Sequence, residues 1–158
     1  MNKPFQRIGS KSNAQVGREF EVAAKQFFGS QNLELQPNFK IDVGVSMFTK
    51  AHAFDLGFET KKILVECKSH RWTSGANVPS AKLTVWNEAM LYFVAAPLEY
   101  RKIMFVLRDY CPKRKETLAG YYLRTYSHLI PSAVEFWEYD DSKRIAMHIA
   151  SKVGVSNT

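Results

Sequence analysis

The sequence has few cysteines and no long apolar run. Its two cysteines, Cys67 and Cys111, are too few for a disulfide framework and lack the spacing of a metal site. We therefore expect reduced thiols and a cytoplasmic location. No stretch approaches the roughly 20 apolar residues that a membrane-spanning helix needs. The basic N-terminus has no apolar segment behind it, so we expect neither a membrane protein nor a secretory signal.

Several sequence patterns typical of active sites are also missing. The chain contains no glycine-rich phosphate loop, no cluster of zinc ligands, no serine or cysteine triad and no internal repeat. With 158 residues, 46% of them hydrophobic and 23% charged, it is expected to form one globular domain. We place this domain at 13–150, between an arm at 1–12 and a tail at 151–158.

Positive charge is in excess, at a formal net charge of +7. This excess favours polyanionic partners, nucleic acid above all. Charge alone does not decide the matter, because many basic proteins bind no nucleic acid. The densest basic run, 112–116 (PKRKE), is either a phosphate-binding segment or a solvated turn.

Apolar positions at helical spacing predict a first helix at 12–30. Ser12 or Asn13 is suited to cap its start, and Gly29 to end it. The residues expected on its buried stripe are Val16, Phe20, Ala23 and Phe27.

The rest of the chain alternates between predicted strands and helices. The expected order is a strand at 39–48, a hairpin at 53–68, a loop at 69–80, a helix at 80–96, a strand at 102–110, a helix at 115–130 and a hairpin at 134–149. The strand at 102–110 is almost continuously apolar, as in strands covered on both faces. This order predicts an α/β fold in which helices flank a mixed sheet.

The first predicted hairpin carries an unusual set of charges. Each of its strands is expected to have one apolar face, with the charges on the other. The loop ETKK would pair Phe58 with Ile63. In that register Asp55 lies opposite Glu66, and Lys68 lies on the same face. Two opposed carboxylates repel each other, which is a poor arrangement for stability alone, but a solvated strand face with no function stays an alternative.

A divalent cation would turn this repulsion into a binding site. Asp55, Glu66 and a main-chain carbonyl such as that of Cys67 suit Mg²⁺, which usually keeps several waters. Lys68 would position or help deprotonate an attacking water and stabilise the transition state. The thiol of Cys67 is expected to point into the core.

The residues FD, ten further residues and ECK resemble the signature of the PD-(D/E)XK nucleases. That superfamily includes restriction-endonuclease-like enzymes and archaeal Holliday-junction resolvases. Phe54 stands here in place of the signature's proline. The resemblance implies a restriction-endonuclease-like core of helix, three strands, helix and strand at 13–108, followed by a C-terminal helix and hairpin. It also implies hydrolysis of DNA phosphodiesters with Mg²⁺, for which Mn²⁺ can substitute.

The resemblance assigns roles residue by residue. It makes Asp55 and Glu66 the metal-binding acids and Lys68 the catalytic lysine. Many members add a glutamate on the first helix. Of Glu19 and Glu21, the family's FE pattern favours Glu21. Helical geometry favours it too, because Glu21 shares a line with Gly17, Ala24 and Phe28 on the flank of the expected buried stripe. A solvated helix position is the alternative for each glutamate.

Residues beyond the lysine offer contacts to DNA. Arg71, in the loop, and Lys82, at the start of the second helix, are the candidates. His70 is interpreted as the polar start of the loop. The aromatic residues in the periodic segments are expected in the core or in a subunit interface: Trp86, Tyr92, Phe93, Tyr121, Tyr122 and Trp137.

The hypothesis is therefore a Mg²⁺-dependent DNA endonuclease. Because two strands must be cut by a small protein, we expect a homodimer or a component of a larger assembly. Two alternatives stay open. One is a catalytically inactive DNA-binding module of the same fold, and the other is a structural or interaction protein.

Overall fold

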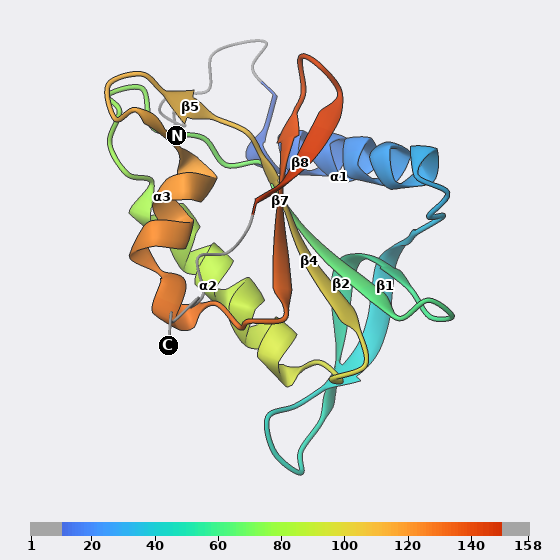
Figure 1. Cartoon of the computed structure of the whole chain (residues 1–158). Coiled ribbons are helices and arrows are strands. Elements are labelled where there is room, and N and C mark those ends of the chain that lie inside the picture. The colour runs from blue at the N-terminus through green and yellow to red at the C-terminus, as the bar shows by residue number, and fades with distance from the viewer. Residues whose placement is uncertain (1–10, 150–158) are drawn as a thin grey trace, which may run out of the picture.

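In the computed structural model, residues 11–149 are described, and six of their strands form one mixed sheet (Figure 1). The sheet has the strand order β1-β2-β3-β4-β7-β8. The elements are α1 (Asn13–Ser30), β1 (Gln36–Val43), β2 (Lys50–Phe58), β3 (Ile63–Lys68), α2 (Ser80–Ala95), β4 (Arg101–Leu107), β5 (Tyr110–Cys111), β6 (Glu116–Thr117), α3 (Leu118–Thr125), the 3₁₀ turn η1 (Ser127–Leu129), β7 (Val134–Asp140) and β8 (Ile145–Ile149). The predicted α/β class, with a mixed sheet between helices, is confirmed.

Strand direction changes across the sheet. β3 runs parallel to β4, and β4 parallel to β7, whereas the outer pairs are antiparallel. Residues 1–10 of the predicted arm and the whole predicted tail, 151–158, lie outside the described residues, as does residue 150. No helix within 11–149 is long and apolar enough to cross a bilayer.

Helices cover both faces of the sheet and create two cores. We call the cluster under α1 the α1-side core; it includes Phe20, Phe28, Leu56, Val65 and Phe105. We call the cluster under α2 and α3 the α2-side core; it includes Phe54, Leu64, Trp86, Phe93 and Tyr122. Adjacent residues of β4 contribute to opposite cores, so the prediction of a strand covered on both faces is confirmed.

The first helix is capped as expected, but the side of it that is buried differs from the predicted one. The Gln15 N–H donates to the hydroxyl of Ser12 over 3.2 Å. The buried side chains are Phe20, Ala24 and Phe28, rather than the full predicted stripe. With 3.6 residues per turn, apolar residues spaced by three or by four both fall on one side of a helix, so Phe20 fits a stripe with Ala23 and Phe27 as well as one with Ala24 and Phe28. Both Phe27 and Phe28 lie against Phe105, with ring centres 5.6 and 5.3 Å away, but only Phe28 is fully buried, while Ala23 and Phe27 pack at the edge of the α1-side core.

Three predicted boundaries shift. The first strand spans Gln36–Val43, and the apolar residues after it lie exposed in the β1–β2 loop. The strand predicted at 102–110 ends at Leu107, and Tyr110 starts the small β5–β6 ladder. The third helix begins only at Leu118, where the Gly120 N–H donates to Thr117 Oγ1.

The β2–β3 hairpin has the predicted register but not the predicted alternation. Phe58 pairs with Ile63, and the main-chain ladder ends at the pair Leu56–Val65. Phe54 belongs to the α2-side core, although Leu56, two residues on, belongs to the α1-side core. β2 therefore changes face between them, and Asp55 lies at the point where β2 and β3 part. The expectation of one apolar face per strand was wrong, because this sheet is buried on both sides.

Candidate active site

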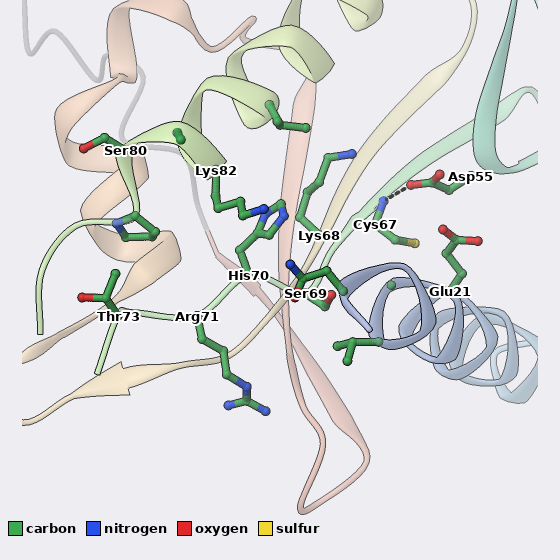
Figure 2. Close-up of a pocket in the computed structure, with 16 residues that line it drawn as sticks. Glu21, Asp55, Cys67, Lys68, Ser69, His70, Arg71, Thr73, Ser80 and Lys82 are labelled. Atoms are coloured by element: carbon green, nitrogen blue, oxygen red, sulfur yellow. Dashed lines mark hydrogen bonds between the residues drawn. The ribbon is translucent and has the colours of Figure 1, made fainter. Parts of the chain in front are cut away.

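The side chain of Asp55 accepts a hydrogen bond where the main-chain pairing between β2 and β3 has ended. The Cys67 N–H donates to Asp55 Oδ2 over 2.7 Å (Figure 2). A buried amide needs an acceptor where the ladder has ended, and this carboxylate supplies it. Among the described residues, Oδ1 of Asp55 has no hydrogen-bond partner. The Cys67 side chain lies in the α1-side core, as expected, and burial raises the pKa of its thiol well above the ordinary range.

Glu66 and Lys68 form a buried ion pair beside Asp55. Lys68 Nζ donates to Glu66 Oε2 over 2.8 Å, and the two side chains are only 13% and 8% exposed. Burial raises the pKa of Glu66, and the Asp55 carboxylate adds to this rise against the opposing charge of Lys68. Burial alone would lower the pKa of Lys68, but the carboxylates of Glu66 and Asp55 outweigh it and hold the pKa above its ordinary value. Lys68 is therefore a cation at neutral pH.

The first helix adds a third carboxylate to this cluster. Glu21 turns its carboxylate toward Asp55 (Figure 2). Burial raises the pKa of Glu21, and the neighbouring charge of Asp55 raises it further. Glu19, the other residue considered from the sequence, instead forms an exposed ion pair with Lys11 at 2.6 Å.

Two hollows meet at this cluster. The larger has a volume of about 750 Å³ and opens between the starts of α1 and α2 and the loop after β3 (Figure 2). The smaller, of about 230 Å³, lies on the α2 side and is lined by Glu66, His52 and Tyr92. Asp55 and Lys68 line both hollows. We call them the main cavity and the α2-side recess.

Both residues expected to contact DNA lie at the main cavity. Lys82 is exposed at the start of α2. Arg71 lines the cavity too, but its Nη1 also lies 3.3 Å from Asp109 Oδ1. The side chain of Arg71 is 59% exposed, so this contact leaves most of it accessible.

His70 has a structural role that the sequence interpretation missed. Its Nδ1 accepts a hydrogen bond from the indole N–H of Trp86 over 2.8 Å. Trp86 is fully buried, and a buried indole needs such an acceptor. Burial, with the positive charges of Lys82 and Lys68, lowers the pKa of His70 to about 4. The imidazole is thus neutral at neutral pH and joins the loop to the core.

The basic run at 112–116 contributes to the loop as well. The guanidinium of Arg114 lies 4.9 Å from the ring centre of Trp72. Its Nε donates to the carbonyl of Ala76 over 2.6 Å. Arg114 therefore packs against the loop between β3 and α2, other residues of which line the main cavity, while Lys113 and Lys115 are exposed.

His52 was not singled out from the sequence. Its Nε2 lies 3.6 Å from Glu66 Oε1. Strict alternation along β2 would put His52 on the face opposite Asp55, so the pattern argued against it. The change of face at Asp55 is what allows both residues to line the α2-side recess.

The donor set fits a hard divalent cation only in part. Within 11–149, no group of three or more His, Cys, Asp or Glu side chains is placed to hold a metal ion. The carboxylates of Asp55 and Glu66 each keep one oxygen without a hydrogen bond in the described structure. Two such oxygens and a main-chain carbonyl suit Mg²⁺, which commonly binds one or two carboxylates and keeps its waters.

In comparisons with known proteins, no family model, no curated protein and no solved structure matches the chain.

Proposed function

We propose that this protein is a PD-(D/E)XK-type nuclease that hydrolyses DNA phosphodiester bonds with a divalent cation. The observation that carries the proposal is that Asp55, Glu66 and Lys68 line one recess. Asp55 raises the pKa of Glu66, so the two acids repel each other in the folded protein. Ionisable groups with perturbed pKa values beside a charged neighbour at a cavity are typical of functional sites.

The order of the elements supports the same proposal. α1, three strands, α2 and β4 follow one another from Asn13 to Leu107. This is the order that the resemblance implies for a restriction-endonuclease-like core. α3 and the β7–β8 hairpin complete the sheet beyond it.

Asp55 and Glu66 would hold Mg²⁺ or Mn²⁺, together with the main-chain carbonyl of Cys67. A bound divalent cation supplies Lewis acidity at the phosphate and offsets the charge that develops there. It would also relieve the repulsion between the two carboxylates. The bond from the Cys67 N–H keeps Asp55 in place before any cation binds.

Lys68 and Glu21 would act on the substrate and on water. Because Lys68 is a cation, its role is to stabilise developing negative charge and to orient the attacking water, rather than to take a proton from it. Glu21, which lines the main cavity with Asp55 and Lys68 and has a raised pKa, would accept a hydrogen bond or a proton from water.

DNA would enter by the main cavity. Lys82 and Arg71 lie at its rim and would contact phosphates, which positions a duplex without reading its sequence. The net charge of +7 favours the same partner. Two copies would be needed to cut both strands, so we propose a homodimer or a larger assembly. Two free, buried cysteines agree with a cytoplasmic location.

Cleavage of supercoiled and linear DNA tests the proposal. The protein and Lys68→Ala are incubated with DNA in Mg²⁺, Mn²⁺ or EDTA. Lys25→Ala, which removes an exposed lysine of α1, is the matched control. We expect nicking in Mg²⁺ or Mn²⁺ that EDTA and Lys68→Ala abolish and Lys25→Ala retains. Equal activity of wild type and Lys68→Ala would mean contamination or a wrong site.

The same experiment distinguishes the proposed nuclease from the main alternative. A catalytically inactive DNA-binding module would retard DNA in a salt-sensitive way and leave it intact in both metals. Lack of both binding and cleavage would favour a structural or interaction protein.

A further inference from the structure

His52 carries a buried polar atom that the described structure leaves without a hydrogen bond. That atom is Nε2, which is shielded from solvent. It lies 3.6 Å from Glu66 Oε1, just beyond hydrogen-bond range. Unpaired buried polar atoms are costly and uncommon, so the placement of this ring requires a reason.

The direction of the ring does not depend on Glu66. His52 stacks on Tyr92 of α2, with ring centres 3.6 Å apart and an interplanar angle of 10°. Phe54 packs against it in a T-shaped arrangement, with ring centres 4.7 Å apart and an interplanar angle of 87°. Contacts from a helix and from its own strand therefore hold the imidazole, and its Nε2 faces Glu66, with which His52 lines the α2-side recess.

Glu66 is held by a direct hydrogen bond at one oxygen only. Lys68 donates to Oε2, and Oε1 faces His52. The terminal torsion of a glutamate is broad, so one hydrogen bond does not fix the plane of the carboxylate. A second donor at Oε1 would fix it. An ionised carboxylate oxygen can accept this hydrogen bond and still offer a lone pair to a cation.

We propose that His52 is a positioning residue for Glu66, donating from Nε2–H to Oε1 and presetting the carboxylate for a divalent cation. The inference rests on the proposed function, because it takes Glu66 as a metal-binding acid. It needs a movement of only a few tenths of an ångström, and the neutral tautomer with hydrogen on Nε2 is sufficient. Carboxylate ligands of metals normally have such outer hydrogen bonds.

Two substitutions separate the N–H donor from the aromatic ring. His52→Phe keeps a flat ring against Tyr92 but has no donor. His52→Gln keeps an N–H donor but has no ring. Binding of Mn²⁺ alone to the full chain is measured by calorimetry, and folding is checked by thermal unfolding. We expect His52→Phe to weaken Mn²⁺ affinity by at least about 10-fold, and His52→Gln to weaken it clearly less.

Kinetics give a second readout. Because His52 lines the α2-side recess and not the main cavity, its loss should leave the KM for DNA near the wild-type value and lower kcat at limiting metal. Saturating Mn²⁺ should recover most of the kcat of His52→Phe. A purely structural role of the ring would not produce recovery by metal.

Three results would overturn the inference. The first is a Mn²⁺ affinity of His52→Phe equal to that of wild type. The second is an equal loss of Mn²⁺ affinity in both variants. The third is a Mn²⁺ affinity of His52→Gln below that of His52→Phe. If His52→Phe does not fold, His52→Ala replaces it. A Mn²⁺ affinity of His52→Ala equal to or higher than that of His52→Gln then overturns the inference. Wild type that binds no Mn²⁺ and cuts no DNA rejects the proposed function together with the inference. If wild type binds Mn²⁺ and cuts DNA and His52→Phe has the same Mn²⁺ affinity, only the role of His52 is rejected.

Discussion

The side chain of Asp55 on β2 accepts a hydrogen bond from the main-chain N–H of Cys67 on β3. The bond lies just beyond the last main-chain pair of the hairpin, Leu56–Val65. One carboxylate thus holds two strands together through Oδ2, while Oδ1 has no hydrogen bond among the described residues. Asp55 therefore has a structural role and a proposed metal-binding role, and substitutions can separate the two.

Asp55→Asn should abolish activity without unfolding the protein. Asparagine keeps an oxygen that can accept from the Cys67 N–H but loses the negative charge. We expect metal-dependent cleavage to fall by about 100-fold or more and the free energy of unfolding to stay within about 1 kcal/mol of wild type. Asp55→Ala leaves the amide unpaired and should cost about 1–3 kcal/mol. Urea unfolding measures both, and equal destabilisation would show that the Cys67 bond adds no stability.

Glu21→Gln should raise the melting temperature of the metal-free protein at neutral pH. Burial and Asp55 raise the pKa of Glu21, so the folded state holds this proton more tightly than the unfolded state does. The stability from this group is present below its ordinary value of 4.5 and is lost as pH rises through the raised pKa. The gain in Tm, measured in EDTA, should therefore shrink toward pH 4.

Glu19→Gln is the matched control for Glu21→Gln. The hydrogen bond from Lys11 lowers the pKa of Glu19, so the charged form of this exposed residue is favoured in the folded state. Its removal should not raise the melting temperature at neutral pH. An equal rise for both variants would point to a general charge effect and not to crowding at Asp55.

His70→Leu should destabilise the fold by about 1–3 kcal/mol, because the buried Trp86 N–H loses its acceptor. The pKa of His70 falls from 6.5 to about 4 on folding, so the unfolded state binds more protons in this window. Wild-type stability should therefore fall as pH drops from 6.5 to about 4, and the variant should lose this part of the dependence. Urea unfolding across pH measures it. His128→Leu, at an exposed position, should stay near wild type.

Two glycine substitutions should act in opposite directions. A Cβ on Gly57 would lie 2.3 Å from a ring carbon of Phe39, so Gly57→Ala should cost about 1–3 kcal/mol. A Cβ on Gly17 in α1 meets nothing within 4 Å. Gly17→Ala should therefore stabilise the helix by about 0.5–1 kcal/mol. Denaturant unfolding of both variants compares the close packing between β1 and β2 with an open face of α1.

Lys82→Ala should weaken DNA binding without changing the fold. In an Asp55→Asn background, which keeps the DNA intact, the plot of log affinity against log salt should lose about one unit of slope. Lys25→Ala, also exposed but on α1, is the control and should keep the wild-type slope. If Lys25→Ala and Lys82→Ala have the same effect, the main cavity is not the DNA entrance.

Local patterns were enough for the elements and for the hairpin register. Ser12 caps α1, and Phe58 pairs with Ile63, as predicted. These features depend on residues near one another in the chain, such as a capping hydroxyl or a four-residue loop, so the sequence alone determines them. The candidate residues Asp55, Glu66 and Lys68 were found in the same way, from spacing within one hairpin.

Only the tertiary structure decided how side chains from distant elements meet. Packing on the sheet decided that Ala24 and Phe28 are fully buried while Ala23 and Phe27 are only half-buried. It also set Glu21, which the sequence already favoured, beside Asp55. Because helices cover both faces of the sheet, Phe54 and Leu56 of β2 can lie in opposite cores, with the change of face at Asp55. This arrangement brings His52 beside Glu66. Periodicity favoured Glu21 over Glu19, but it cannot show how closely Glu21 approaches Asp55 or His52 approaches Glu66, because each approach depends on a surface supplied by another part of the chain. The sequence determined the elements and the charged hairpin, whereas packing between layers decided which side chains surround it.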